Sequence, residues 1–133
     1  MQVLAIEPNK TAYEAEIGNE LLDMQKLVGG YIQATYPFEE PTALICNEDG
    51  KFEGLPLNRA LRDEDGEIYD IVAGTFFICG LSENNFASLA PEYMEKFKRE
   101  FYHPEIFARI GSKIVAIEVT EEYLRRNPPS ERK

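Results

Sequence analysis

Hydrophobic and polar residues follow two different periods along this chain, which predicts that it contains both strands and helices. Residues 3–6 form a short apolar run that ends near Pro8, as expected of a first strand. Tyr13, Ala15 and Ile17 then alternate with glutamates, the two-residue period of a half-buried extended segment. The chain is therefore expected to open with two strands.

The first predicted helix begins at Asn19 and ends at Val28. Asparagine is a favoured residue at helix N-caps, so Asn19 is expected to cap this helix. Leu21, Met24 and Val28 recur at helical spacing on one face, and Leu22 widens that face. The two glycines that follow are expected to end the helix, because glycine readily adopts the left-handed conformation of a helix end.

The second predicted helix begins at Pro91 and extends to Tyr102. Proline is favoured at the first helical position, and Met94, Phe97 and Phe101 form an apolar stripe at helical spacing. Acidic side chains near its start and basic side chains near its end match the helix dipole. This segment is the best-defined helix in the sequence.

Four further segments have the composition of strands. Residues 31–36 and 43–46 are rich in apolar, aromatic and β-branched side chains, and residues 68–79 form a longer run interrupted at Gly74. In residues 113–119 alternate positions form two sets, one on each face of an expected strand. Strands in succession with tight turns between them favour an antiparallel sheet. The predicted fold is α+β, a mostly antiparallel sheet with two main helices packed on it.

The turns between these strands carry the acidic residues. Residues 47–50 and 63–66 both end in Asp-Gly, which is typical of tight turns. We expect residues 51–52 to pair back after the first turn as a hairpin. Residues 58–62 are predicted to form a single helical turn that Asn58 caps.

Length and composition indicate one folded domain. The chain has 133 residues, of which 44% are hydrophobic, enough for one core without metal or disulfide support. We expect a single globular domain over residues 1–126 and a flexible tail over residues 127–133.

Cys46 and Cys79 lie in apolar runs and are expected to be buried free thiols. With no signal peptide or membrane-length apolar run recognised, the expected location is the cytoplasm, away from membranes.

Charge narrows the classes of partner. The net charge is −10, and residues 1–90 carry 16 acidic and 5 basic side chains, whereas residues 91–133 carry 8 and 9. Such a surface repels phosphates and disfavours direct nucleic-acid binding. It suits a basic protein partner, an acidic imitation of DNA, or simply a domain kept in solution by its charge.

The motifs of common catalytic and metal sites are missing. Neither acidic turn has the ligand spacing of an EF-hand, and two distant cysteines with one histidine do not form a zinc site. His103 is expected to interact with the last carbonyl groups of the second helix. No phosphate-binding or dinucleotide-binding glycine motif occurs. We therefore expect no cofactor, no metal and no catalytic residue, and we favour a protein that is not an enzyme.

Asn58, Arg59 and Asp70 remain as candidate ligand- or partner-binding residues. An arginine on a stiff turn beside an asparagine is suited to hold a carboxylate or phosphate through two hydrogen bonds. In the other interpretation, Arg59 braces the fold by pairing with Asp70 or an acidic turn, while Asn58 caps the predicted helical turn. The sequence leaves both interpretations open.

Several motifs of the first 82 residues also resemble a known family. They are Val-Gly-Gly-Tyr-Ile at 28–32, Asn-Glu-Asp-Gly-Lys at 47–51, Leu-Pro-Leu-Asn-Arg at 55–59 and Asp-Ile-Val-Ala-Gly-Thr-Phe at 70–76. In these, the chain resembles a bacterial family known only as a domain of unknown function. The resemblance implies an accessory protein of gut bacteria, carried on phage or other mobile elements, and brings no activity or catalytic residue with it.

These observations lead to one main hypothesis and two alternatives. The main hypothesis is a non-enzymatic protein-binding accessory module with a protein partner. The alternatives are an acidic DNA mimic that acts against a host defence nuclease, and a small-ligand binder at the Asn58-Arg59 turn.

Overall fold

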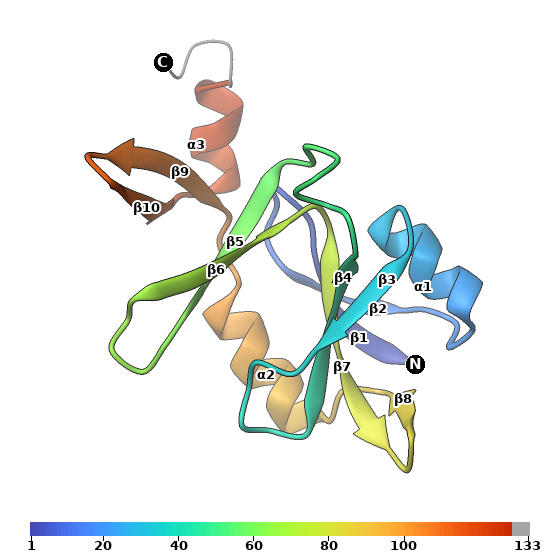
Figure 1. Ribbon diagram of the computed structural model, residues 1–133. Helices are drawn as coiled ribbons and strands as arrows, with labels where there is room; N and C mark the ends of the chain where they lie inside the picture. The colour runs from blue at the N-terminus through green and yellow to red at the C-terminus, as the bar shows by residue number, and fades with distance from the viewer. Residues whose placement is uncertain (129–133) are drawn as a thin grey trace.

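The computed structural model describes residues 1–128, and Figure 1 shows their arrangement as a central sheet with smaller hairpins beside it. The elements, in chain order, are β1 (Gln2–Ile6), β2 (Tyr13–Glu16), α1 (Leu21–Val28), β3 (Ile32–Thr35), β4 (Thr42–Asn47), β5 (Leu57–Arg62), β6 (Ile68–Ala73), β7 (Phe76–Ser82), β8 (Asn85–Ala87), α2 (Pro91–Glu100), β9 (Glu105–Ile110), β10 (Lys113–Glu118) and α3 (Glu121–Arg126).

Six strands form the main sheet. Five follow one another in the order β2-β1-β7-β4-β3, and β8 pairs with β7; every pairing is antiparallel. The strands β5 and β6 form a separate two-stranded sheet, and β9 and β10 form another. The predicted α+β fold with antiparallel pairing is confirmed.

The two longer helices cover opposite faces of the main sheet. Alternate residues of the central strands point to opposite sides, so that Leu44 packs in the cluster that contains α2 and Ile45 packs in the cluster that contains α1. Burial on both faces explains why β1, β4 and β7 read as continuous apolar runs instead of alternating ones. The apolar stripe of α2 reaches this core through Met94, Phe97 and Phe101, as predicted.

Helix α1 begins later than predicted. Its N-cap is Glu20 instead of Asn19, and the Asp23 carboxylate accepts a hydrogen bond from the Glu20 amide at 3.3 Å. The predicted contribution of Leu21 and Leu22 to the buried face is wrong, because both side chains are exposed. The helix ends at Gly29, whose φ of 78° is left-handed, as expected.

Two predictions for the middle of the chain are wrong. Residues 51–52 do not pair back as a hairpin but lie in turns, where the Glu53 amide bonds to the Asp49 carbonyl at 2.8 Å. Residues 58–62 are part of strand β5 and not a helical turn. Tertiary contacts explain this second error, because the side chains of Asn58 and Arg59 are extended into the core, where they find partners far away in sequence.

The C-terminal elements form a small unit of their own. The predicted last strand is present as β10, but within the described residues it pairs only with β9, a strand that no sequence pattern indicates. Helix α3 was likewise unpredicted; Thr120 caps it by accepting a hydrogen bond from the Tyr123 amide at 3.0 Å. Figure 1 shows this unit at the end of the molecule where β5 passes β9. Residues 129–133 of the predicted tail lie outside the described residues.

Candidate functional site

Asn58 holds three parts of the fold together. Its side chain is fully buried, and the amide group donates to the Ile6 carbonyl at 2.9 Å and to the Gly74 carbonyl at 2.8 Å. These bonds connect β5 to the end of β1 and to the turn between β6 and β7. Gly74 has a φ of 82°, which a residue with a side chain rarely adopts, so this turn depends on glycine.

Arg59 is the largest fully buried side chain among the described residues. Its Nε donates to the Phe101 carbonyl at 3.2 Å, Nη1 to the Asn58 Oδ1 at 2.8 Å and Nη2 to the Lys10 carbonyl at 2.6 Å. Burial lowers the pKa of the guanidinium to about 10, with Glu105 acting in the opposite direction. Arg59 therefore links β5 to the end of α2 and to the loop after β1.

The hydrogen bonds of Arg59 correspond to an internal brace, although its partners are carbonyl groups and not the predicted carboxylates. Asp70 instead forms an ion pair with Lys51 at the surface. In the strand register Asp70 lies opposite Leu61, and Arg59 lies opposite Val72. The structure thus brings Asn58 and Arg59 together but leaves Asp70 apart from them.

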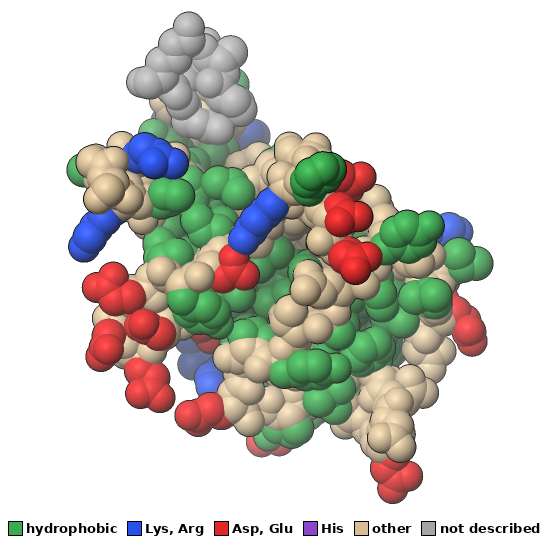
Figure 2. All heavy atoms as spheres, in the orientation of Figure 1, with side chains coloured by type: hydrophobic (Ala, Val, Ile, Leu, Met, Phe, Trp, Pro, Cys, Tyr) green, Lys and Arg blue, Asp and Glu red, His purple; other side chains and the backbone are tan. Residues whose placement is uncertain are grey.

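Asp70 lines a groove between the two small hairpins, which we call the hairpin groove. It has a volume of about 830 Å³. Its walls are Lys51, Leu57, Arg62, Gly66, Glu67, Ile68, Tyr69, Asp70, Ile71, Ser112, Lys113, Ile114, Val115 and Ala116. Figure 2 shows apolar side chains gathered between the two hairpins and acidic side chains gathered at the tip of the β5–β6 hairpin.

The hairpin groove is lined by large exposed apolar side chains as well as by charged ones. Tyr69 is 55% exposed, and Leu57 and Ile114 are each 41% exposed, which is high for such large apolar side chains. Among its charged lining residues, Glu67 and Lys113 form no ion pair within the described residues. The groove therefore offers apolar surface together with unneutralised charge.

Glu105 fixes the C-terminal hairpin to the rest of the molecule. Its carboxylate is buried and accepts hydrogen bonds from the Ala60 amide at 2.7 Å and from the Arg62 side chain at 3.0 Å. No pattern in the sequence marks Glu105, since a glutamate just after a proline carries no local signal of burial. The position of β9 beside β5, and with it the hairpin groove, depends on this carboxylate.

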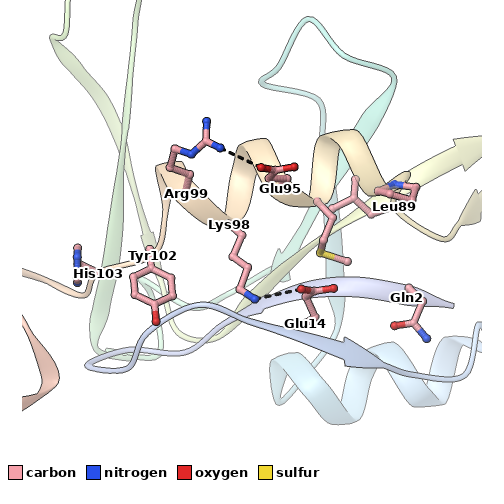
Figure 3. Close-up of a pocket in the computed structure, with 10 residues that line it drawn as sticks. Gln2, Glu14, Leu89, Glu95, Lys98, Arg99, Tyr102 and His103 are labelled. Atoms are coloured by element: carbon pink, nitrogen blue, oxygen red, sulfur yellow. Dashed lines mark hydrogen bonds and ion pairs between the residues drawn. The ribbon is translucent and has the colours of Figure 1, made fainter.

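A second pocket, of about 690 Å³, lies between α2 and the strands β1 and β2 (Figure 3). Its charged side chains neutralise one another: Lys98 pairs with Glu14 at 3.0 Å, and Arg99 pairs with Glu95 at 3.1 Å (Figure 3). His103 lines one end, as the close-up shows. The prediction that His103 meets the last carbonyls of α2 is wrong, because its buried Nδ1 has no hydrogen-bond partner among residues 1–128.

The two cysteines are free thiols. Cys79 is buried, as predicted, and its burial raises the pKa of the thiol to about 12, which makes the nucleophilic thiolate scarce. Cys46 is only half-buried, in contrast to the prediction.

Within residues 1–128, no three metal-binding side chains come together, and no helix is long and apolar enough to cross a membrane.

Comparisons with known proteins bear on the first three quarters of the chain. A profile of the domain of unknown function DUF3846 matches residues 1–102, which end just after α2. No curated protein and no solved structure matches the chain. The brace residues Asn58 and Arg59 lie inside the matched region, and the β9–β10 hairpin lies beyond it. The chain therefore belongs to the DUF3846 family, whose function is unknown.

Proposed function

We propose that this protein is a non-enzymatic binding module that holds an extended segment of a protein partner in the hairpin groove. The observation that carries the proposal is the exposure of large apolar side chains, such as Tyr69 and Ile114, along a groove that two hairpins border. Contiguous exposed apolar surface with a polar rim is typical of protein interaction sites.

The shape of the groove favours an extended occupant. Four consecutive residues of β6, 68–71, and four of β10, 113–116, line it. Consecutive strand residues point to opposite faces, so only the edge of a strand presents them together. Each of these strands pairs with one neighbour in its two-stranded sheet, which leaves its other edge without a strand partner in that sheet. A free strand edge is a template for pairing with another chain.

The direction of the peptide groups in β10 supports the same occupant. The Val119 amide bonds to the Pro104 carbonyl at 2.9 Å, which makes this a hydrogen-bonded pair of the antiparallel ladder. Because such pairs alternate, the peptide groups of Ile114 and Ala116 point away from β9. They are available to an incoming strand.

Charge favours a basic segment. Asp63, Glu64, Asp65 and Glu67 surround the tip of the β5–β6 hairpin, and within the described residues none of them forms an ion pair. Lysine or arginine side chains at one end of the bound segment would approach this tip, while apolar side chains cover Leu57, Tyr69 and Ile114.

The alternatives have less support. A DNA mimic needs carboxylates in a continuous row, whereas on the face shown in Figure 2 the acids form separate groups. A small-ligand site at Asn58 and Arg59 would need these side chains at a surface, and both are buried with internal partners. The pocket beside α2 has its charges already paired.

A random-peptide display library selected on the immobilised protein tests the proposal. Selected peptides should alternate apolar residues with others and carry lysine or arginine near one end. Their affinity, measured by calorimetry, should fall at least about tenfold in Ile114→Lys, because a charge then replaces one of the exposed apolar side chains that line the groove. Added salt should weaken binding as well.

The matched control is Leu81→Lys, because Leu81 has the same 41% exposure as Ile114 but lies on β7, away from the groove. Affinity should be unchanged in this variant. Failure to select any peptide, or equal binding to wild type and Ile114→Lys, would contradict the proposal.

A further inference from the structure

The five-strand path of the main sheet ends in β2 on one side and β3 on the other, and the edges of these two strands differ in charge. At one end, β2 places two glutamates, Glu14 and Glu16, in a strand of four residues. At the other end, β3 and its flanking residues, 31–36, contain no charged side chain. Proteins commonly protect free strand edges with charges, so the uncharged edge of β3 requires an explanation.

The peptide groups of β3 that point outward can be identified. The Glu48 amide bonds to the Tyr31 carbonyl at 2.8 Å, so residues 31 and 48 form a hydrogen-bonded pair with β4. In the antiparallel register these pairs alternate, and the peptide groups of Ile32, Ala34 and Tyr36 therefore face away from β4. Within residues 1–128, no hydrogen bond reaches the outward amides of Ile32 and Ala34.

We propose that the edge of β3 binds the same edge of a second copy of this chain, so that two six-stranded sheets join into one. A two-fold axis makes the strands antiparallel, and outward peptide groups must meet outward peptide groups. This requirement permits a register in which Ala34 faces Ala34 of the second copy and Ile32 faces Tyr36. The edge is thus complementary to itself.

The side chains fit this register. Ile32 and Ala34 pack against the cluster beneath α1, so the face that carries them is apolar. Tyr36 is 61% exposed and belongs to the same alternate set of residues. In the pair, each Tyr36 covers the Ile32 of the other copy, an aromatic and β-branched combination that favours strand pairing. Gln33 and Thr35 then face each other on the opposite side.

The net charge determines the strength of this contact. Each copy carries a net charge of −10, so two copies repel one another, and only a few backbone hydrogen bonds and two Ile32–Tyr36 contacts oppose the repulsion. The dimer is therefore weak and reversible, and salt strengthens it by screening the repulsion. Salt should have the opposite effect on the binding of a basic peptide in the hairpin groove, which separates the two proposals.

Sedimentation equilibrium over a range of protein and salt concentrations tests this inference. Wild type should show a monomer–dimer equilibrium that shifts to dimer as salt rises. Tyr36→Lys should weaken dimerisation about tenfold or more, because it removes both cross-strand contacts and adds a charge to the edge. Tyr69→Lys, at a tyrosine of similar exposure on β6, should dimerise like wild type. Circular dichroism of each variant verifies folding.

Hydrogen exchange on wild type provides a test that needs no variant. The amides of Ile32 and Ala34 should exchange more slowly at high protein concentration, whereas the outward amides of Glu14 and Glu16 should not change. A monomer at every concentration and salt, a dimer that Tyr36→Lys leaves intact, or a dimer that Tyr69→Lys weakens equally would overturn the proposal.

Discussion

The family region and the C-terminal hairpin are held in place by different means. In residues 1–102 a sheet is buried on both faces, and Asn58 and Arg59 connect β5 to the end of β1 and to the end of α2 through hydrogen bonds to distant carbonyl groups. The β9–β10 hairpin has a mostly exposed surface and is joined to β5 through the carboxylate of Glu105. A closed family core thus carries an attached element that leaves apolar surface open.

This difference shows where a function can be sought. Asn58 and Arg59 lie inside the region that matches the family, and their buried hydrogen bonds serve the stability of the fold. The groove with exposed apolar side chains lies between the family region and the element beyond it, so the binding properties of this chain are expected to depend on both.

The largest effect is expected from removing the brace. Arg59→Met keeps most of the side-chain volume but leaves the carbonyls of Lys10 and Phe101 without partners inside the protein. We expect the free energy of unfolding to fall by about 3 kcal/mol, measured by urea denaturation. Arg62→Met, at a partly exposed arginine three residues on, should cost about 1 kcal/mol. Equal losses would mean that Arg59 is not a brace.

A smaller, local effect is expected from releasing the hairpin. Glu105→Ala leaves the Ala60 amide unpaired and breaks the ion pair with Arg62, at a cost of about 2 kcal/mol. Hydrogen exchange should accelerate in β9 and β10 and stay unchanged in β1, β4 and β7. Glu118→Ala, at the exposed residue directly opposite in the ladder, is the control and should change neither. Uniform acceleration across the molecule would contradict a separately attached hairpin.

Two glycines permit the same comparison at turns. Gly74→Ala should destabilise by roughly 2 kcal/mol, because φ is left-handed and the new Cβ would lie 2.7 Å from the Leu55 Cδ1. Gly111, in the β9–β10 turn, also has a positive φ, but no atom lies within 4 Å of an added Cβ. We therefore expect Gly111→Ala to lower the free energy of unfolding by about 1 kcal/mol. Thermal denaturation of both variants measures the difference. A larger loss for Gly111→Ala would indicate that the hairpin is as tightly packed as the core.

The smallest effect concerns pH. Burial raises the pKa of the Cys79 thiol from 9.0 to about 12, so the folded protein retains a proton that the unfolded chain loses. The contribution of the Cys79 thiol to the free energy of unfolding is fully present below pH 9 and is lost as the pH rises towards 12. Between pH 9 and 10 the free energy of unfolding should fall by about 1 kcal/mol, and by less in Cys79→Ala. An identical slope in both proteins would exclude Cys79 as the cause.

The sequence predicts elements whose residues are governed by local pattern or by burial. The stripe of Met94, Phe97 and Phe101 identifies α2, and the apolar runs around Leu44 and Ile78 identify central strands, because burial on one or both faces leaves a direct trace in composition. The end of α1 is also predictable from local sequence, because Gly29 adopts the left-handed conformation that ends the helix.

The remainder depends on contacts between distant residues. Asn58 and Arg59 resemble a capped turn, yet their partners are Ile6, Phe101 and Lys10, which no local pattern connects with them. Asp70 was grouped with them through proximity in sequence, whereas the strand register separates it. The hairpin groove was not predicted because it forms between segments more than 40 residues apart, and β9 itself went unrecognised.

Residue-resolved hydrogen exchange, with and without a library-selected peptide, shows directly whether the hairpin groove is where the peptide binds. We expect slower exchange for the amides of Ile114 and Ala116 and for residues 68–71 when the peptide is bound, with β1, β4 and α2 unchanged. Slower exchange around the pocket beside α2 instead, or no change at β6 and β10, would contradict the hairpin groove as the binding site.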